Sequence, residues 1–115
     1  MIVIASKYLI PKGYTGMALF PFILLRDKRM KTNNRLINHE KIHLRQQLEL
    51  LILPFYIWYG IEYGILLIKL RDKKKAYYSI SFEREAYANE ADLNYLKTRL
   101  FWQFLNFIKQ KNAVQ

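Results

Sequence analysis

The 115-residue sequence contains no cysteine, only two histidines and only nine acidic residues. The absence of cysteine excludes disulfide scaffolds, thiolate metal sites and cysteine nucleophiles. Any metal site in this chain must therefore use histidine and carboxylate ligands. The sequence also lacks a basic region before its first apolar residues, a feature that secretory signal peptides carry. We therefore expect a cytoplasmic protein with no signal peptide.

Acidic residues are outnumbered, since 19 lysines and arginines give the chain a formal net charge of +10. A charge of this size on a small protein favours an anionic neighbour, such as a membrane surface, a nucleic acid or an acidic substrate. Hydrophobic residues make up 52% of the chain, enough for a folded core. The length supports one domain and leaves no room for a second independent core. We predict a single domain over residues 1–115.

The N-terminal part of the chain has the composition of strands and turns. Residues 1–26 predict a small β hairpin, with one strand within 1–10 and a second over 17–25. A polar loop follows, and Asn33 or Asn34 is suited to cap the next helix.

The remainder of the chain has helical periodicity, which predicts an α+β fold that is mostly α. Residues 35–70 contain a polar helix followed by an apolar helical segment, with Pro54 expected to kink or end the first helix. A last helix is predicted over 79–108. Its first turn carries acidic residues, which suit the positive end of the helix dipole.

Both histidines of the chain lie in one motif, His39-Glu40-Lys41-Ile42-His43. On a helix, two histidines four residues apart lie on one face and can reach a single ion. Glu40 projects about 100° around the helix, where it can take a proton from a water that the metal activates. A pair of histidines with this spacing and this Glu would arise by chance on the order of once in a thousand such compositions.

A catalytic zinc usually has three protein ligands and an open position, so the two histidines need one more ligand. Without further histidine or cysteine, that ligand must be a carboxylate. The candidates are Asp27, Glu49, Glu62 and the acidic residues of the segment 82–90. Spacing alone leaves the choice among them open.

The motif at 39–43, followed by Phe82-Glu83-Arg84-Glu85-Ala86, resembles the gluzincin metallopeptidases. The likeness is closest to the CAAX prenyl protease and HtpX-like group and to the peptidase domains of β-lactam sensor proteins. The resemblance implies a zinc site whose third ligand is Glu83, with Glu85 as the second choice. Tyr87 stands where that family prefers an aspartate that supports the metal ligands from behind.

The resemblance further implies hydrolysis of a peptide or protein substrate, with Glu40 as the general base. The developing oxyanion needs a donor, and the candidates are Tyr77, Tyr78, Tyr87 and Arg84. A catalytically inactive zinc-binding domain is the alternative, because so short a chain has little room for a substrate cleft beside a core.

An apolar stretch raises the question of a membrane. Residues 50–68 are interrupted only by Glu62 and are long enough to cross a bilayer. A single crossing would separate the two histidines from Glu83, so the metal site requires the chain to fold back, at Pro54 or near Gly60 and Gly64.

The same stretch carries tyrosines and a tryptophan that suit a membrane interface. A third interpretation is therefore a basic module that binds an anionic membrane surface peripherally, with these residues: Lys28, Arg29, Lys31, Arg71, Lys73, Lys74 and Lys75. Nucleic acid is not expected as a partner, because no nucleic-acid-binding motif accompanies the basic residues. The sequence leaves the oligomeric state open.

Overall fold

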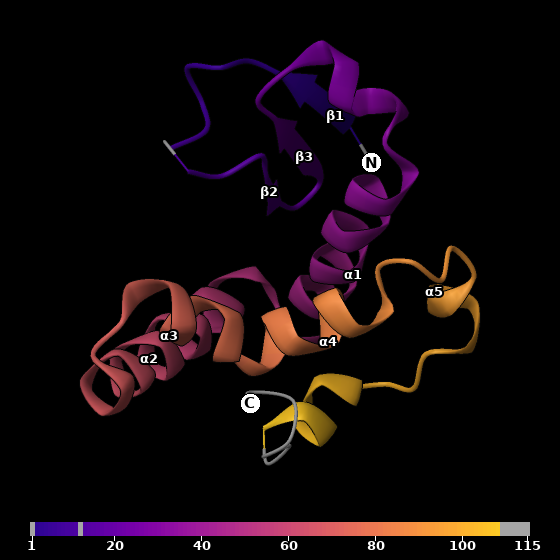
Figure 1. Ribbon diagram of the computed structural model, residues 1–115. Helices are drawn as coiled ribbons and strands as arrows, with labels where there is room; N and C mark the ends of the chain where they lie inside the picture. The colour runs from indigo at the N-terminus through magenta and orange to yellow at the C-terminus, as the bar shows by residue number, and fades with distance from the viewer. Residues whose placement is uncertain (1, 12, 109–115) are drawn as a thin grey trace.

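The computed structural model describes residues 2–11 and 13–108 and confirms a mostly helical α+β fold with a small N-terminal sheet (Figure 1). Its strands are β1 (Ile2–Ala5), β2 (Gly16–Leu19) and β3 (Phe22–Leu25). Its α-helices are α1 (Asn34–Leu50), α2 (Ile52–Leu70), α3 (Lys73–Ser79), α4 (Ser81–Asn89) and α5 (Tyr95–Thr98). Two 3₁₀ helices, η1 (Lys28–Thr32) and η2 (Gln103–Phe107), complete the described elements. Helix α1 connects the sheet to the group formed by α2, α3 and α4 (Figure 1).

The sheet has three strands in the order β1-β3-β2, which corrects the prediction of a two-stranded hairpin over 1–26. Strand β1 pairs with β3 in parallel, and β2 pairs with β3 antiparallel, with Leu19 opposite Phe22. The strand predicted over 17–25 is divided because the chain turns at Pro21, which has no N–H to donate to a ladder. In the order β1-β3-β2, strand β2 lies at an edge of the sheet.

Helix α1 covers the sheet and begins as predicted. The side chain of Asn33 accepts a hydrogen bond from the backbone N–H of Leu36 (3.1 Å), which caps the helix. The segment 27–34, predicted as a loop, contains the 3₁₀ helix η1. An apolar cluster fills the space between α1 and the sheet, and its buried members are Ala18, Ile23, Leu25 and Leu44.

The chain folds back between α1 and α2, as the predicted metal site requires. The break lies at Leu51, whose φ of 64° is outside the helical region. Pro54 sits in the first turn of α2, where its missing N–H has no helical partner to lose. Because a proline also clashes with the carbonyl four residues earlier, α1 cannot continue through it. Gly60 and Gly64 lie inside α2, so the chain does not reverse at either.

A second apolar cluster joins α2, α4 and η2, and its buried members are Phe55, Ile80, Phe82 and Phe104. Glu62, the acidic residue of the apolar stretch, caps α4. Its carboxylate accepts hydrogen bonds from the backbone N–H of Ser81 (2.5 Å) and from the Ser81 hydroxyl (2.8 Å). The start of α4 is thereby fixed against the middle of α2.

The single helix predicted over 79–108 is wrong. Helix α4 ends at Asn89, and the chain continues through turns, α5 and η2. The side-chain amide of Asn38 ends the helix by donating to the backbone carbonyls of Asn89 (3.4 Å), Glu90 (2.8 Å) and Asp92 (2.9 Å). Leu93 and Leu100, which follow the end of α4, are exposed.

Candidate metal centre

Helix α1 presents the three candidate functional side chains of the motif from two successive turns. His39, Glu40 and His43 are all buried, each with no more than 5% of its surface exposed. The two imidazole rings lie edge to face with their centroids 4.8 Å apart. The predicted placement of both histidines on one helix face is thus present in the structure.

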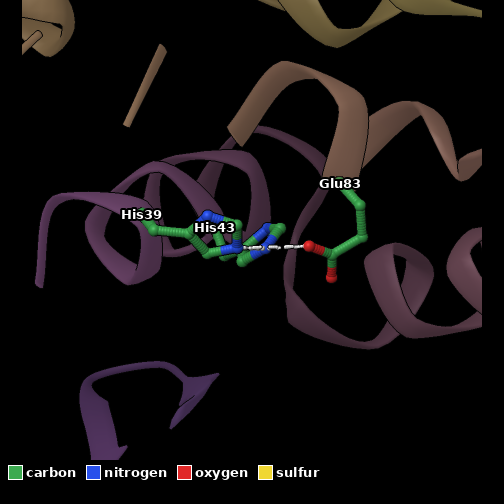
Figure 2. Close-up of side chains that lie close together, drawn as sticks. All are labelled: His39, His43 and Glu83. Carbon is green, nitrogen blue, oxygen red and sulfur yellow. Dashed lines mark hydrogen bonds and ion pairs between the residues drawn. The ribbon is translucent and has the colours of Figure 1, made fainter. Parts of the chain in front are cut away.

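Glu83 reaches the two histidines from the first turn of α4. Its Oε1 lies 3.2 Å from Nε2 of His39 and 3.0 Å from Nε2 of His43 (Figure 2). The two Nε2 atoms are themselves 3.2 Å apart. The structure therefore brings together the two histidines and the carboxylate that the resemblance implied as third ligand, across 40 residues of sequence.

The three atoms are spaced as ligands of one small ion would be. Bonds of about 2.0–2.1 Å in a tetrahedral arrangement place neighbouring ligand atoms about 3.3 Å apart. The observed distances of 3.0–3.2 Å are close to this value. The group can hold a metal ion by geometry and by ligand type, and a fourth tetrahedral position would remain for water or substrate.

Hydrogen bonds on the far sides of the rings orient both imidazoles. Nδ1 of His39 donates to Oε1 of Glu90 (2.8 Å), and Nδ1 of His43 donates to Oε1 of Gln46 (2.8 Å). The amide of Gln46 is held in this orientation because its Nε2 donates to the carbonyl of Phe82 (3.2 Å) and to Glu85 (2.8 Å). In neutral imidazoles both Nε2 atoms then present lone pairs toward Glu83, an arrangement that a cation stabilises.

The second oxygen of Glu83 is held from α2. The hydroxyl of Tyr59 donates to Oε2 of Glu83 at 2.7 Å, which turns Oε1 toward the histidines. Burial and the neighbouring negative charge of Glu83 raise the pKa of Tyr59, so the phenol keeps its proton. Each of the three candidate ligands therefore has a fixed partner behind it: Glu90, Gln46 or Tyr59.

The ligand group is electrostatically coupled. Burial opposes protonation of His43, but the charge and hydrogen bond of Glu83 outweigh it and raise the pKa of His43 to about 9. Burial likewise opposes ionisation of Glu83, yet both imidazoles hold the pKa of this carboxyl well below its usual range. For Glu40, burial dominates and raises the pKa of the carboxyl above its usual value.

The other candidate ligands have different roles. Glu85, the second choice, points away from the histidines and binds the guanidinium of Arg99, whose side chain is fully buried. Glu49 binds the same guanidinium at 2.6 Å. Asp27 caps η1 and Glu62 caps α4, so neither reaches the candidate metal centre.

Tyr87 occupies the position at which the family that the motif resembles prefers a supporting aspartate. Its ring packs edge to face against His39, with centroids 4.4 Å apart. Glu90, three residues further along, supplies the carboxylate that hydrogen-bonds His39, and Arg35 forms an ion pair with Glu90. The support expected from residue 87 is thus provided from residue 90.

The four candidate oxyanion donors are not equivalent. Nη1 of Arg84 donates to the carbonyl of Phe107, which lies where α4 packs against η2 and away from the histidines. Tyr78 and Tyr87 line one half of the cleft described below, whereas Tyr77 lines both halves. The hydroxyl of Tyr77 lies 3.3 Å from that of Tyr87.

A cleft passes over Glu40 between the edge strand β2, α1 and the α2–α3 pair. One half has a volume of about 470 Å³ and includes basic side chains, namely Arg35, Lys73 and Lys74. The other half has a volume of about 360 Å³ and is mostly aromatic, with Phe55, Tyr56, Tyr59 and Tyr63 along one wall. Tyr14, Gly16, Glu40 and Tyr77 line both halves, so the two meet beside the motif.

Comparison of the chain with known protein families, curated proteins and solved structures found no match.

Three residues around the candidate ligands have roles that the sequence alone does not predict. Gln46 lies one turn after His43, and Glu90 lies about two turns after Glu83, so helical spacing offered a signal for both. Tyr59 comes from a separate helix, and its contact with Glu83 could not be read from spacing.

Proposed function

We propose that this protein is a zinc-dependent metallopeptidase that hydrolyses peptide bonds. The observation that carries the proposal is the convergence of His39, His43 and Glu83 within 3.0–3.2 Å of one another, with Glu40 buried beside them. Two imidazoles and a carboxylate with an open fourth position are a ligand set of catalytic zinc sites. A bound zinc ion would supply Lewis-acid activation of a water molecule and of the scissile carbonyl.

Glu40 is suited to act as general base. Within the described residues, no hydrogen bond occupies its carboxylate, which is therefore available to a water in the cleft. Burial raises its pKa, which brings its proton affinity closer to that needed near neutral pH. Glu40 would take a proton from the attacking water and transfer it to the leaving amine.

Tyr77 is the proposed donor to the negative charge that develops on the carbonyl oxygen. It lines both halves of the cleft, so its hydroxyl can face the middle of an extended peptide. Burial and the nearby charge of Glu83 raise the pKa of Tyr77, which keeps the hydroxyl protonated and able to donate.

The walls of the cleft indicate the kind of peptide that fits. Arg35, Lys73 and Lys74 favour an acidic side chain on one side of the scissile bond. Phe55, Tyr56 and Tyr63 favour an apolar or aromatic side chain on the other side. A peptide library that varies these two positions is therefore the appropriate substrate.

The test is elemental analysis and peptidase assay of protein purified without a histidine tag. We expect about one zinc per chain, lost in H43A and reduced in E83A. Glu40→Gln should retain zinc and lose hydrolysis by about a hundredfold or more. Lys41→Gln, in the same helical turn, is the control and should change neither. Zinc binding without hydrolysis of any library member would replace this proposal with the inactive zinc-binding domain, and absence of zinc would contradict both.

A further inference from the structure

We infer that the exposed face of α2 docks on the surface of an anionic lipid bilayer, with the helix lying in the plane of the membrane. This inference is independent of the proposed peptidase activity. It rests on the chemistry of one helix face, the packing of the opposite face and the charges at the end of the helix.

The outward face of α2 is apolar over its whole length. Its aliphatic members are 54–78% exposed and are spaced one turn apart: Leu53, Ile57, Ile61, Ile65 and Ile68. Gly60 and Gly64 share this face, and a Cβ added to either would meet no atom within 4 Å. The face spans about 140° of the helix surface and contains no charged residue. A continuous exposed apolar surface of this kind marks an interaction site.

The opposite face of α2 fixes how the helix can meet a membrane. It packs through Phe55, Trp58 and Tyr59 on the cluster that contains Phe82 of α4. If α2 crossed the bilayer, α4 with the buried Glu83 and α3 with its three lysines would enter hydrocarbon beside it. Such burial of charge is costly. An orientation in the membrane plane keeps the apolar face in lipid and the metal ligands in the protein.

Basic residues at the C-terminal end of α2 select the type of membrane. Five exposed cations gather there, with Asp72 as the single acidic residue among them: Lys69, Arg71, Lys73, Lys74 and Lys75. The net charge of +10 opposes close approach of a second copy of the chain and favours a negatively charged surface. Cations beside an interfacial helix strengthen binding to anionic lipid.

The experiment measures binding of the full chain to vesicles of phosphatidylcholine and phosphatidylglycerol in a ratio of about 7:3. We expect binding that weakens with salt and on pure phosphatidylcholine. The double variant I61D/I65D should bind at least about tenfold more weakly than wild type, because it replaces two exposed aliphatic side chains that would enter the lipid. The matched control, L93D/L100D, adds the same two negative charges at exposed leucines outside α2 and should lose much less.

A second measurement does not depend on the folding of the aspartate variants. In W102F, Trp58 on α2 is the sole tryptophan, since the chain has two. Lipids brominated near the headgroup should quench its fluorescence more than lipids brominated near the bilayer centre. The inference is overturned if wild type does not bind anionic vesicles, if both aspartate pairs weaken binding equally, or if deep bromines quench more strongly. It is also overturned if the wild-type protein is a dimer that does not bind vesicles, and if the I61D/I65D substitutions convert that dimer to monomers.

Discussion

Glu83 and Glu90 bind opposite nitrogens of the same imidazole. Oε1 of Glu83 lies 3.2 Å from Nε2 of His39, and Oε1 of Glu90 accepts the hydrogen bond from Nδ1 of His39 at 2.8 Å. One carboxylate therefore faces the candidate metal position, and the other sets the tautomer of the ring. Glu83 comes from the first turn of α4 and Glu90 from its C-terminal cap, so the two ends of one short helix define how His39 is presented.

Removal of the Glu90 carboxylate should weaken metal binding without removing a ligand. We expect Glu90→Ala to lower zinc affinity about 10- to 100-fold, because the ring loses the partner that fixes its orientation and basicity. Competition with a chromogenic chelator measures the change. Asp92→Asn is the control, since its Oδ1 accepts a hydrogen bond from the nearby backbone N–H of Asn94 and from no other group in the described part of the chain. Equal affinities of E90A and wild type would show that Glu90 does not support His39.

Gly16 should be required for hydrolysis and not for metal binding. A Cβ at this position would lie 3.1 Å from Oε2 of Glu40, so Gly16→Ala must displace the proposed base by a few tenths of an ångström. We expect zinc content to stay unchanged and kcat to fall about tenfold or more, because proton transfer depends on placement. Gly60→Ala, with open space around it, should keep full activity and stabilise α2 by about 0.5–1 kcal/mol.

Arg99 should contribute strongly to stability through the carboxylates it neutralises. Its guanidinium binds Glu49 and Glu85, and the side chains of Arg99 and Glu85 are both fully buried. We expect Arg99→Met to lower the free energy of unfolding by about 3–5 kcal/mol, because it leaves buried charges unpaired. Urea denaturation measures this loss. R45M, at a partly exposed position, is the control and should have little effect. Adding E85Q to R99M should recover part of the loss. A small loss of stability in R99M alone would contradict the stabilising role assigned to Arg99.

The metal-free protein should have a characteristic pH dependence. The pKa of His43 is about 9 in the fold and near 6.5 when unfolded, so its contribution to stability is complete below pH 6.5 and is lost as pH rises to 9. The pKa of Glu83 is depressed below its ordinary 4.5, so its contribution is present above that pH and is lost as pH falls below it. Stability in the presence of chelator should therefore be greatest between about pH 4.5 and 6.5.

Zinc affinity should also depend on the protonation of His43. Since a metal displaces the proton from His43, the affinity should rise about tenfold per pH unit up to pH 9 and then level off. In Glu83→Gln the raised pKa of His43 loses its largest cause, so metal-free stability should decline much less between pH 6.5 and 9. An undiminished decline in E83Q would assign it to another group.

The candidate metal ligands are the most predictable part of this molecule. Two histidines four residues apart require only a helix to converge, and Asn33 begins that helix as its sequence indicates. The choice of Glu83 over Glu85 came from resemblance, because spacing alone does not say which carboxylate of α4 faces α1. In the structure, Arg99 binds the carboxylate of Glu85 and holds it away from the histidines, so Glu83 is the carboxylate that faces them.

The remaining differences arise where long-range contacts override local pattern. Apolar spacing over 79–108 predicts one helix, but Asn38, more than fifty residues away, captures the carbonyls at the end of α4. Strand β1 pairs in parallel with β3 and does not form the predicted hairpin. Tertiary packing determines this pairing, and composition alone does not predict it. Tyr59 contacts Glu83 only because the chain reverses at Leu51 and Arg71.

The 40 residues that separate Glu83 from His43 in the sequence also affect the conformational entropy of the unfolded chain when a metal is bound. A metal held at both ends converts α2 and α3 into a closed loop, as a covalent cross-link would, and removes conformational freedom from the unfolded chain. The same ion would connect the apolar cluster under the sheet with the one between α2 and η2. The two halves of the molecule would then melt as one cooperative unit when the ion is bound, and chelation would allow them to separate into two transitions.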